Sequence, residues 1–488
     1  MNKGDTLELT ISSYASEGKG IAKVYRSKIK PQQKTEVQNV EEENYVVFVQ
    51  GSYPGDKVTA QLRRIKNSYA EAKAIEIISP SKHRVEPRCK FFGTCGGCRQ
   101  QDLNYETQLK YKEELVKETF EHIGGLTDYK FENIVPSEKV FFYRNKMEFS
   151  FSDKRWLTKD EIGADEIIDK DFALGLHIPR IFDKVLDIDE CFLQSELSNK
   201  ILNFTRKFFK EKSTTIYSTK THKGYLRNLV IRQSQNTDDL MVNLVTSSED
   251  DELMNEYTTE LLKAVPQITT IINNINLKKA SVAIGDYEKV YYGSGYIYDM
   301  IGDYKFRISS NSFFQTNTLQ AENLYKTALD FAELKGDEII YDLYSGAGTI
   351  AIYVSDEAGK IYGFESIKSA LIDAEKNAII NSVDNVEFIE ANLYKTFLPI
   401  VEKKKIPKPD AMIIDPPRSG MHKNTIDDVI QLDPGKIVYV SCNPATQARD
   451  IKMMVEAGYK LKKMKPVDMF PHTYHIENVA FLSNGKKE

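Results

Sequence analysis

The chain lacks the features that mark membrane proteins and exported proteins. Nowhere in its 488 residues do apolar side chains run for the roughly 18 positions that a membrane-spanning helix requires. The opening residues, MNKGDTLELTISS, lack the apolar core of a secretory signal. We therefore expect a cytoplasmic protein, a monomer without a membrane partner, with material for about two to four domains.

Cysteine is scarce, with only five residues in the chain. A large chain without an export signal does not favour a disulfide framework. Cys89, Cys95 and Cys98 crowd into ten residues, Cys191 is a candidate fourth ligand, and Cys442 stands apart. Four thiolates suit either zinc or an iron–sulfur cluster, and the C-x5-C-x2-C spacing matches neither the ferredoxin run nor a zinc ribbon. The sequence predicts a structural metal site, its metal left open, and one separate thiol.

A large excess of charge is also absent, since the net charge of the whole chain is −5. That balance argues against indiscriminate binding of polyanions. Residues 1–90 nevertheless carry 16 Lys and Arg against 11 Asp and Glu, so the N-terminal part is basic and the remainder acidic. A basic N-terminal module favours contact with nucleic acid, although an ordinary basic surface explains the charge equally well.

Short strands dominate the first 80 residues. Apolar and polar side chains alternate over residues 7–11, 45–49 and 57–62. Gly18-Lys19-Gly20 and Pro54-Gly55-Asp56 supply turns, and the polar residues 27–44 read as a mobile hairpin tip. The pattern predicts a small β-barrel. The order Glu-Gly-Lys-Gly-Ile-Ala, strand, Pro-Gly-Asp resembles the TRAM domain, an OB-like barrel with which many RNA-modifying enzymes grip RNA.

Residues 81–300 carry weaker functional signals. Helical periodicity over 104–123 ends at Gly124-Gly125, and strand-like runs cover 146–151 and 229–232. The basic and aromatic run 143–146, YRNK, is a candidate RNA contact or simply an exposed surface. We expect a central α+β domain here, which also holds the crowded cysteines.

From about residue 301 the strands alternate with helices, as in a doubly wound α/β domain. Residues 338–350 read as a buried strand, a turn with Gly346 and Gly348, and a helix start. About twenty residues later Glu365 ends a second strand, where an acid is placed to bind the two hydroxyls of a ribose. Asn392 follows a third strand. A D-x-x-x-G-x-G turn with these residues is typical of S-adenosylmethionine-dependent methyltransferases rather than nicotinamide enzymes.

Two further strands end in chemically useful residues. Asp415-Pro416-Pro417-Arg418 follows one of them, and the arginine stands where enzymes that methylate a base nitrogen usually carry an aromatic residue. The other ends at Cys442, because Pro444 cannot continue a strand. A thiol at that edge suits a nucleophile or, as for most lone cysteines, a small buried side chain. A hairpin over 472–482 is expected to close the sheet.

Together these motifs are similar to those of the RNA uracil-5 methyltransferases over nearly the whole chain. Besides the barrel and the cysteine group, they are Phe313-Phe314-Gln315-Thr316-Asn317, Asp342-Leu343-Tyr344-Ser345-Gly346-Ala347-Gly348, Asp415-Pro416-Pro417-Arg418, Ser441-Cys442-Asn443-Pro444 and His475-Ile476-Glu477. The resemblance implies that Cys442 is the nucleophile and Glu477 the base. It also implies cofactor contacts at Gln315, Tyr344, Glu365, Asn392 and Asp415. Thr349 departs from the asparagine that family members often carry there.

The chemistry of that family explains these residue types. Carbon 5 of uracil is a poor nucleophile, and a thiolate that adds to carbon 6 converts the base into an enolate. Carbon 5 then attacks the methyl group of S-adenosylmethionine, a base removes the carbon-5 proton, and the thiolate leaves. The uracil must leave its stack to reach a thiol in a pocket, which implies base flipping.

Within the family, the barrel and the four cysteines mark the enzymes that act on 23S ribosomal RNA. The resemblance therefore implies 23S ribosomal RNA as the partner. It also implies a [4Fe-4S] cluster on Cys89, Cys95, Cys98 and Cys191. Alternative substrates are transfer RNA or more than one ribosomal uridine. A non-catalytic RNA-binding assembly factor is the alternative of a different class.

The expected architecture has three parts. They are a TRAM-like β-barrel at 1–80, a central α+β iron–sulfur domain at 81–300, and a Rossmann-like α/β methyltransferase domain at 301–488. The resemblance also implies that the helix at 104–123 packs on the catalytic domain, so that the central domain is discontinuous in sequence.

Overall fold

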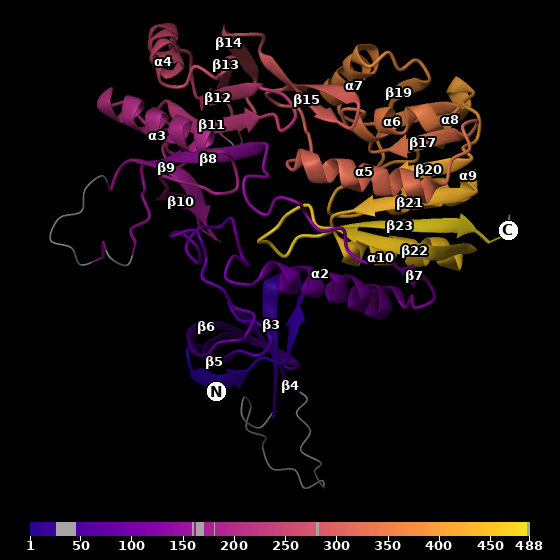
Figure 1. The fold of residues 1–488 in the computed structure, drawn as a ribbon, viewed down its shortest axis with the longest axis horizontal. Coiled ribbons are helices and arrows are strands. Elements are labelled where there is room, and N and C mark those ends of the chain that lie inside the picture. Colours follow the sequence, from indigo (N-terminus) through magenta and orange to yellow (C-terminus); the bar gives the residue numbers. More distant parts are fainter. Residues whose placement is uncertain (26–44, 159–160, 163–169, 180, 280–282, 486–488) are drawn as a thin grey trace. The chain divides into compact units, whose positions relative to one another are not determined.

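The computed structural model describes residues 1–25, 45–158, 161–162, 170–179, 181–279 and 283–485. These residues form two compact units, each assembled from separate stretches of the chain. The first comprises Met1–Lys90, Cys98–Glu118 and Phe470–His475, and the second comprises Phe91–Gly97, Thr119–Met469 and Ile476–Glu488. The predicted hairpin tip at 27–44 lies outside the described residues. Figure 1 labels the helices and strands.

In the first unit, six strands form one sheet around a single hydrophobic core. The strands are β1 (Thr6–Thr10), β2 (Ser13–Ala15), β3 (Lys19–Val24), β4 (Tyr45–Gln50), β5 (Lys57–Ile65) and β6 (Tyr69–Ser79), in the order β1-β5-β6-β4-β3-β2. Only β4 and β6 run parallel among the paired strands. Alternate side chains of each strand point inward, so Leu9, Val47, Val58 and Ala70 share one core. The predicted strand-rich N-terminal domain is confirmed.

One predicted turn in this unit is a strand. A short 3₁₀ segment, Ser16–Gly18, makes the turn, and β3 begins at the next residue. Gly20 pairs with Val49 inside the sheet. A Cβ at Gly20 would lie 2.5 Å from the Ser52 Oγ and 2.7 Å from the Ile11 Cγ2. This glycine therefore allows close packing rather than a tight turn.

The first unit also holds most of α2 (Tyr105–Thr119) and the C-terminal segment Phe470–His475. The His472 N–H donates to the Gln108 Oε1 at 2.8 Å, and the Lys112 Nζ donates to the Phe470 carbonyl at 3.1 Å. The φ of His472 is 64°, a value that a strand does not allow. The predicted hairpin over 472–482 therefore has the wrong bounds: its strand begins only at Glu477 and pairs antiparallel with the preceding strand, Tyr459–Val467.

The second unit contains a seven-stranded sheet in the order β10-β9-β8-β11-β12-β13-β14. Its strands are β8 (Lys146–Ser152), β9 (Ala173–Ile178), β10 (Ile181–Asp187), β11 (Leu226–Gln233), β12 (Leu240–Thr246), β13 (Thr270–Ile275) and β14 (Tyr287–Tyr292). Helices α3 (Glu196–Glu211) and α4 (Asp251–Ala264) pack on its apolar face. There the rings of Phe151 and Phe209 lie 6.2 Å apart, and those of Phe209 and Tyr257 lie 4.9 Å apart. A hairpin of β15 (Tyr296–Ile301) and β16 (Tyr304–Ser309) follows.

The same unit contains an eight-stranded sheet in the order β19-β18-β17-β20-β21-β23-β22-β7. Its strands are β7 (Lys130–Phe131), β17 (Ile339–Leu343), β18 (Lys360–Glu365), β19 (Val386–Glu390), β20 (Ala411–Ile414), β21 (Lys436–Ser441), β22 (Tyr459–Val467) and β23 (Glu477–Asn484). The five strands from β17 to β21 run parallel, and β23 is inserted antiparallel between β21 and β22. The predicted α/β methyltransferase arrangement is present.

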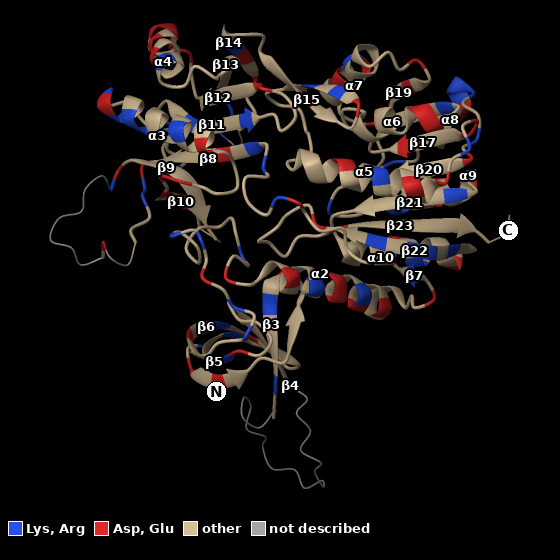
Figure 2. Ribbon diagram, in the orientation of Figure 1, with Lys and Arg blue, Asp and Glu red and all other residues tan. Residues whose placement is uncertain are grey.

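Helices flank this sheet, as expected for parallel strands that are buried on both faces. They are α5 (Thr318–Ala332), α6 (Thr349–Tyr353), α7 (Lys368–Ile380), α8 (Leu398–Lys404), α9 (Lys423–Leu432) and α10 (Pro444–Glu456). Figure 2 shows charged residues on the helices, while β21 and β23 carry almost none. A π-helical turn, Phe120–Gly124, lies against α10, where a Cβ at Gly124 would be 3.6 Å from the Ala448 Cβ.

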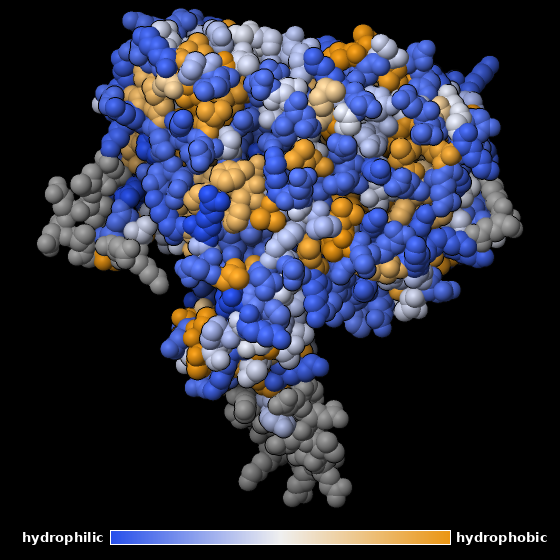
Figure 3. Space-filling view, viewed as in Figure 1, coloured by the Kyte–Doolittle hydropathy of each residue, from blue (hydrophilic) through white to orange (hydrophobic). Residues whose placement is uncertain are grey.

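Hydrophobic side chains on the face seen in Figure 3 form separate small patches among hydrophilic ones. Within the described ranges, no helix combines the length and the apolar character needed to cross a membrane.

Candidate active site

The carboxyl ends of neighbouring parallel strands bring four predicted site residues to one edge of the eight-stranded sheet. Tyr344 follows β17, Glu365 ends β18, Asp415 follows β20 and Cys442 follows β21. The parallel register keeps these strand ends level. This edge is where open α/β sheets bind their ligands.

Cys442 and Glu477 lie next to the last residue pair of two antiparallel strands, β21 and β23. Strands β21 and β23 are paired as far as Ser441 and Asn478, so the next residues along are Cys442 on one strand and Glu477 on the other. Only 5% of the Glu477 surface is exposed, and Cys442 is half-buried. A buried carboxyl beside a thiol is chemically poised, whereas an ordinary surface acid would face water.

The charges around Cys442 work against its ionisation. Burial, together with the nearby carboxyls of Glu477 and Asp415, raises the pKa of the Cys442 thiol to about 11, and Arg418 opposes that shift. Burial, and then Asp415, raises the pKa of Glu477 well above its usual range, with Arg418 again opposing. Burial raises the pKa of Asp415 to about 7. Cys442, Glu477, Asp415 and Arg418 therefore influence one another electrostatically, and Asp415 can exchange a proton near neutral pH.

The loop that carries Arg418 is tied to the start of α10. The Asn443 Nδ2 donates to the Arg418 carbonyl at 2.9 Å, and the Thr446 Oγ1 donates to the same oxygen at 3.3 Å. The Asn443 Oδ1 also accepts the Ala445 N–H at 3.1 Å and so caps the helix. β21 ends at Ser441, three residues before Pro444, and Pro444 begins α10, since proline suits the first turn of a helix.

The turn after β17 holds a backbone N–H group against the buried carboxylate of Glu365. The Gly346 N–H donates to the Glu365 Oε2 at 3.0 Å, and the Glu365 Oε1 accepts the N–H groups of Ser366 and Ile367 at 2.6 and 2.8 Å. Gly346 has a φ of 55°, and a Cβ there would meet no atom within 4 Å. Space therefore lies directly beside a fixed carboxylate, an arrangement that suits ribose hydroxyls.

At this turn the buried Ser345 hydroxyl has no hydrogen-bond partner among the described residues, and the buried Asp342 carboxyl receives a backbone hydrogen bond from Ala351. Asp342 is 1% exposed, and burial, followed by the Asp415 carboxyl, raises its pKa well above the usual range. An unsatisfied buried polar group costs about 1–3 kcal/mol, so it favours a ligand that completes it. These residues fit a polar cofactor that carries a ribose. The sequence motif contains Asp342, but we assigned it no role from the motif alone.

The remaining predicted cofactor residues lie on loops. Asn392 follows β19 and is exposed, and its Oδ1 accepts the Tyr394 N–H at 3.0 Å. Gln315 is half-buried just before Asn317, the residue that caps α5. The Thr349 hydroxyl hydrogen-bonds the buried Tyr325 hydroxyl at 2.9 Å, so it serves packing at the start of α6.

Comparison with known proteins agrees with this geometry. The family model described as tRNA (Uracil-5-)-methyltransferase matches residues 237–485, about half of the chain. The chain belongs to the RNA uracil-5-methyltransferase family. The model of the TRAM domain matches residues 2–75, within the six-stranded sheet of the first unit.

Relatives of this uracil-5-methyltransferase match along its whole length. An uncharacterized RNA methyltransferase of Chlorobaculum tepidum is 43% identical over 99% of this chain and 97% of its own length. One of Bacteroides thetaiotaomicron is 41% identical over 96% of this chain and 99% of its own. The Pyrococcus abyssi tRNA (uracil-54, C5)-methyltransferase, solved in complex with S-adenosyl-L-homocysteine, has a TM-score of 0.71 at 29% identity and covers 97% of this chain and 99% of its own. The protein is thus an S-adenosylmethionine-dependent RNA methyltransferase.

The four cysteines that are predicted to bind a metal are divided between the two units. Cys89 and Cys98 belong to the first unit, Cys95 and Cys191 to the second, and all four are half-buried. The Cys98 Sγ accepts the Gln101 Nε2–H, and the Cys95 Sγ accepts the Gly97 N–H, both at 3.3 Å. Among the described residues, no group of three or more His, Cys, Asp or Glu side chains is close enough to hold a metal ion. The predicted iron–sulfur domain is therefore not supported by the geometry.

The run at 143–146 contributes less to RNA contact than its composition suggests. Tyr143 is fully buried, so its ring cannot stack on a base, and only 5% of Asn145 is exposed. Arg144 is half-buried, and its main-chain N–H donates to the Leu193 carbonyl at 2.8 Å. Periodicity at strand starts does not separate buried from exposed side chains, which is why the sequence could not show this.

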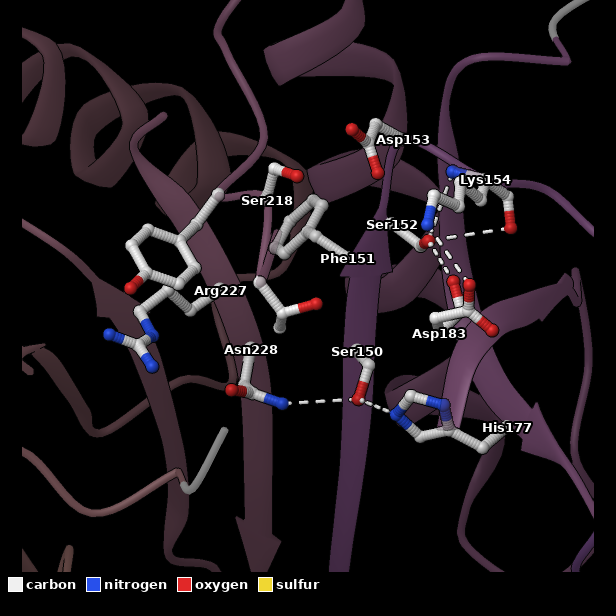
Figure 4. Close-up of a pocket in the computed structure, with 12 residues that line it drawn as sticks. Ser150, Phe151, Ser152, Asp153, Lys154, His177, Asp183, Ser218, Arg227 and Asn228 are labelled. Carbon is white, nitrogen blue, oxygen red and sulfur yellow. Dashed lines mark hydrogen bonds and ion pairs between the residues drawn. The ribbon is translucent and has the colours of Figure 1, made fainter. Parts of the chain in front are cut away.

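A pocket lies on the seven-stranded sheet of the second unit, which we call the central sheet (Figure 4). It contains none of the predicted site residues. Its Asn228 amide donates to the Ser150 Oγ at 3.1 Å, and the same oxygen lies 3.0 Å from the His177 Nε2. Lys154 pairs with Asp183 at 2.9 Å on the other side. Opposite charges thus offset each other, and the pocket lacks the excess of positive charge that favours RNA phosphates.

Proposed function

We propose that Cys442 and Glu477 together methylate carbon 5 of a flipped uridine. The Cys442 thiolate adds to carbon 6, which forms a C–S bond and makes carbon 5 nucleophilic. Carbon 5 would then take the methyl group of bound S-adenosylmethionine, with cleavage of the sulfur–methyl bond and S-adenosylhomocysteine as the leaving group. Glu477 then takes the carbon-5 proton, the C–S bond breaks, and Cys442 leaves as the thiolate. The observation that carries this proposal is that Cys442 and buried Glu477 each adjoin the last residue pair of β21 and β23, Ser441 and Asn478.

In this mechanism Arg418 assists formation of the thiolate, because it is the cation that lowers the Cys442 pKa. On the cofactor side, Glu365 binds the ribose hydroxyls. Gln315, Tyr344, Asn392 and Asp415 complete the contacts with S-adenosylmethionine. Support comes from the fixed Glu365 carboxylate, the open space at Gly346 and the buried Ser345 hydroxyl, which has no hydrogen-bond partner among the described residues.

Methyl transfer is expected to accelerate as the pH rises from about 6 to about 9. Below its pKa of about 11 the thiol yields about tenfold more thiolate per pH unit. The rate at low concentrations of both substrates, which reports the free enzyme, should follow that increase. Arg418→Gln removes the opposing cation, so it should be about tenfold slower at neutral pH, with its profile displaced to higher pH. A rate independent of pH in both proteins would show that ionisation of Cys442 does not limit the reaction.

For the RNA partner, we propose 23S ribosomal RNA. The basis is the resemblance of the barrel and the cysteine group to the ribosomal branch of the family. A second candidate is transfer RNA, and a specific finding favours it. The Pyrococcus abyssi enzyme named for uracil 54 of tRNA covers 97% of this chain, the N-terminal sheet included. The barrel is therefore not a mark of ribosomal substrates alone.

Transfer of labelled methyl groups separates these candidates. The purified cytoplasmic enzyme would be offered unmodified 23S ribosomal RNA and unmodified transfer RNA with labelled S-adenosylmethionine, followed by nucleoside analysis. Label in 5-methyluridine from 23S RNA alone is the expected result. Label in transfer RNA would support the proposed reaction but would show that transfer RNA, rather than 23S RNA, is the substrate. No label in either RNA would favour the assembly-factor alternative.

For Cys89, Cys95, Cys98 and Cys191, we propose a [4Fe-4S] cluster with a structural role. Their density in a cysteine-poor chain and the N–H groups donated to Cys95 and Cys98 support thiolate ligands. Anaerobically purified protein is expected to contain about four iron and four sulfide per chain. Cys95→Ser should lose the iron, and Cys442→Ser, which lies outside the group, should keep it. Zinc in place of iron would contradict the proposal.

A further inference from the structure

Asn145 is a buried side chain that joins the central sheet to the segment that carries Gln315. It precedes β8, and only 5% of its surface is exposed. Its Nδ2 donates to the Gln315 carbonyl at 2.7 Å and to the Thr318 Oγ1 at 2.8 Å. Both amide hydrogens are then used, so the orientation of the amide is fixed.

The backbone of Asn145 adds two further links. Its N–H donates to the Thr316 carbonyl at 2.8 Å, and its carbonyl accepts the Gln233 N–H at the end of β11, also at 2.8 Å. Asn145 thus binds two successive peptide groups around Gln315 and is itself anchored in the central sheet.

A buried carboxylate sets the direction of this network. The Thr318 hydroxyl donates to the Asp299 Oδ2 at 2.7 Å, which leaves a lone pair on the Thr318 oxygen to accept from Asn145. Asp299 is fully buried, and its Oδ1 accepts the Ser234 hydroxyl at 2.6 Å and the Asn236 N–H at 3.0 Å. Hydrogen bonds to a charged acceptor are stronger than neutral ones, so Asp299 holds Thr318 in one rotamer.

Residues 310–312, which begin the segment that carries Gln315, are anchored independently. The buried Arg232 donates through its Nη2 to the Ser310 carbonyl at 3.2 Å and also to the Ser312 carbonyl. Loss of the Asn145 contacts would therefore release the chain near Gln315 without detaching the whole segment.

We propose that Asn145 is a positioning residue that fixes the main chain at Gln315 and thereby sets the affinity for S-adenosylmethionine. Asp299 acts through Thr318 to hold the Asn145 amide in place. The inference rests on the proposed contact between Gln315 and the cofactor. It assigns to the central sheet a part in cofactor binding, beyond any part it takes in binding RNA.

Asn145→Ala and Thr318→Val are expected to weaken binding of S-adenosylhomocysteine about tenfold, the size of one buried hydrogen bond. Calorimetry without RNA measures this, and kcat at saturating S-adenosylmethionine should change much less than KM. The matched control is Asn273→Ala. Asn273 is equally buried in the same sheet, and its amide donates to the Leu244 carbonyl at 2.9 Å and the Thr246 Oγ1 at 3.0 Å. It should lower Tm while leaving the affinity unchanged.

A double variant tests whether Asn145 acts through Gln315. Gln315→Ala and the double variant Asn145→Ala/Gln315→Ala should bind S-adenosylhomocysteine equally weakly. Once the Gln315 side chain is removed, loss of the Asn145 contacts that position it has no further effect. Full affinity in both Asn145→Ala and Thr318→Val, or additive losses in the double variant, would overturn the inference alone. Full affinity in Gln315→Ala would overturn it together with the proposed contact of Gln315.

Discussion

Replacement of Cys442 by alanine should lower methyl transfer by about 10⁴-fold or more, the size seen when an enzyme loses its nucleophile. Without the thiol no bond forms to carbon 6, and carbon 5 stays too poor a nucleophile to take the methyl group. Serine at the same position should be almost as inactive, since a hydroxyl ionises far less readily than a thiol. Incorporation of labelled methyl into RNA measures both variants.

The fold should survive these changes, because Cys442 is half-buried and follows its strand rather than forming part of it. Binding of S-adenosylhomocysteine by Cys442→Ala at wild-type affinity is the control for an intact cofactor site. Methylation by Cys442→Ala at the wild-type rate would sink the covalent mechanism and leave Cys442 as a packing residue.

Glu477→Gln should block turnover by about 10³-fold and trap the protein on its RNA. The glutamine cannot remove the carbon-5 proton, so addition and methyl transfer proceed and the C–S bond persists. A band of protein joined to methylated RNA on a denaturing gel is the expected observation. The matched control is Glu338→Gln, because Glu338 is also buried but precedes β17 at the opposite edge of the sheet. That variant should turn over normally and form no lasting adduct.

Glu477→Gln should also change the pKa of the Cys442 thiol, and the loss of a negative charge gives the direction of that change. The ionised Glu477 carboxyl contributes to the raised pKa of Cys442, so an uncharged glutamine lowers that pKa and increases the thiolate fraction at any pH where Glu477 is ionised. Adduct formation in Glu477→Gln should therefore be at least as fast as in the wild-type enzyme. An adduct that forms more slowly than in the wild type would argue that Glu477 acts in the addition step instead.

Sequence reasoning located the strand ends well, for a physical reason. Buried parallel strands are apolar runs that stop at glycine, proline or an acid, and this pattern placed Glu365, Asp415 and Cys442 where the structure has them. Function at such sheets lies just past the strand ends, so the candidate site followed from local sequence alone.

What the sequence did not predict depends on contacts between distant residues. Asn145 and Thr318 are 173 positions apart, and nothing local distinguishes Asn145 from an exposed polar residue. Residues 472–475 were expected to belong to a hairpin, yet the segment 470–475 contacts Gln108 and Lys112 in the first unit. The sequence also did not show which strand pairs with β21. In the structure β23 lies between β21 and β22.

The most direct measurement identifies the residue that becomes joined to the RNA. RNA with 5-fluorouridine at the target position would be incubated with enzyme and S-adenosylmethionine, digested, and examined by mass spectrometry. Fluorine at carbon 5 cannot be removed as a proton, so the adduct should persist in the wild-type protein. We expect a methylated fluorouridine attached to the peptide that contains Cys442. Attachment to Cys89, Cys95, Cys98 or Cys191, or complete methyl transfer with no attachment, would contradict covalent catalysis by Cys442.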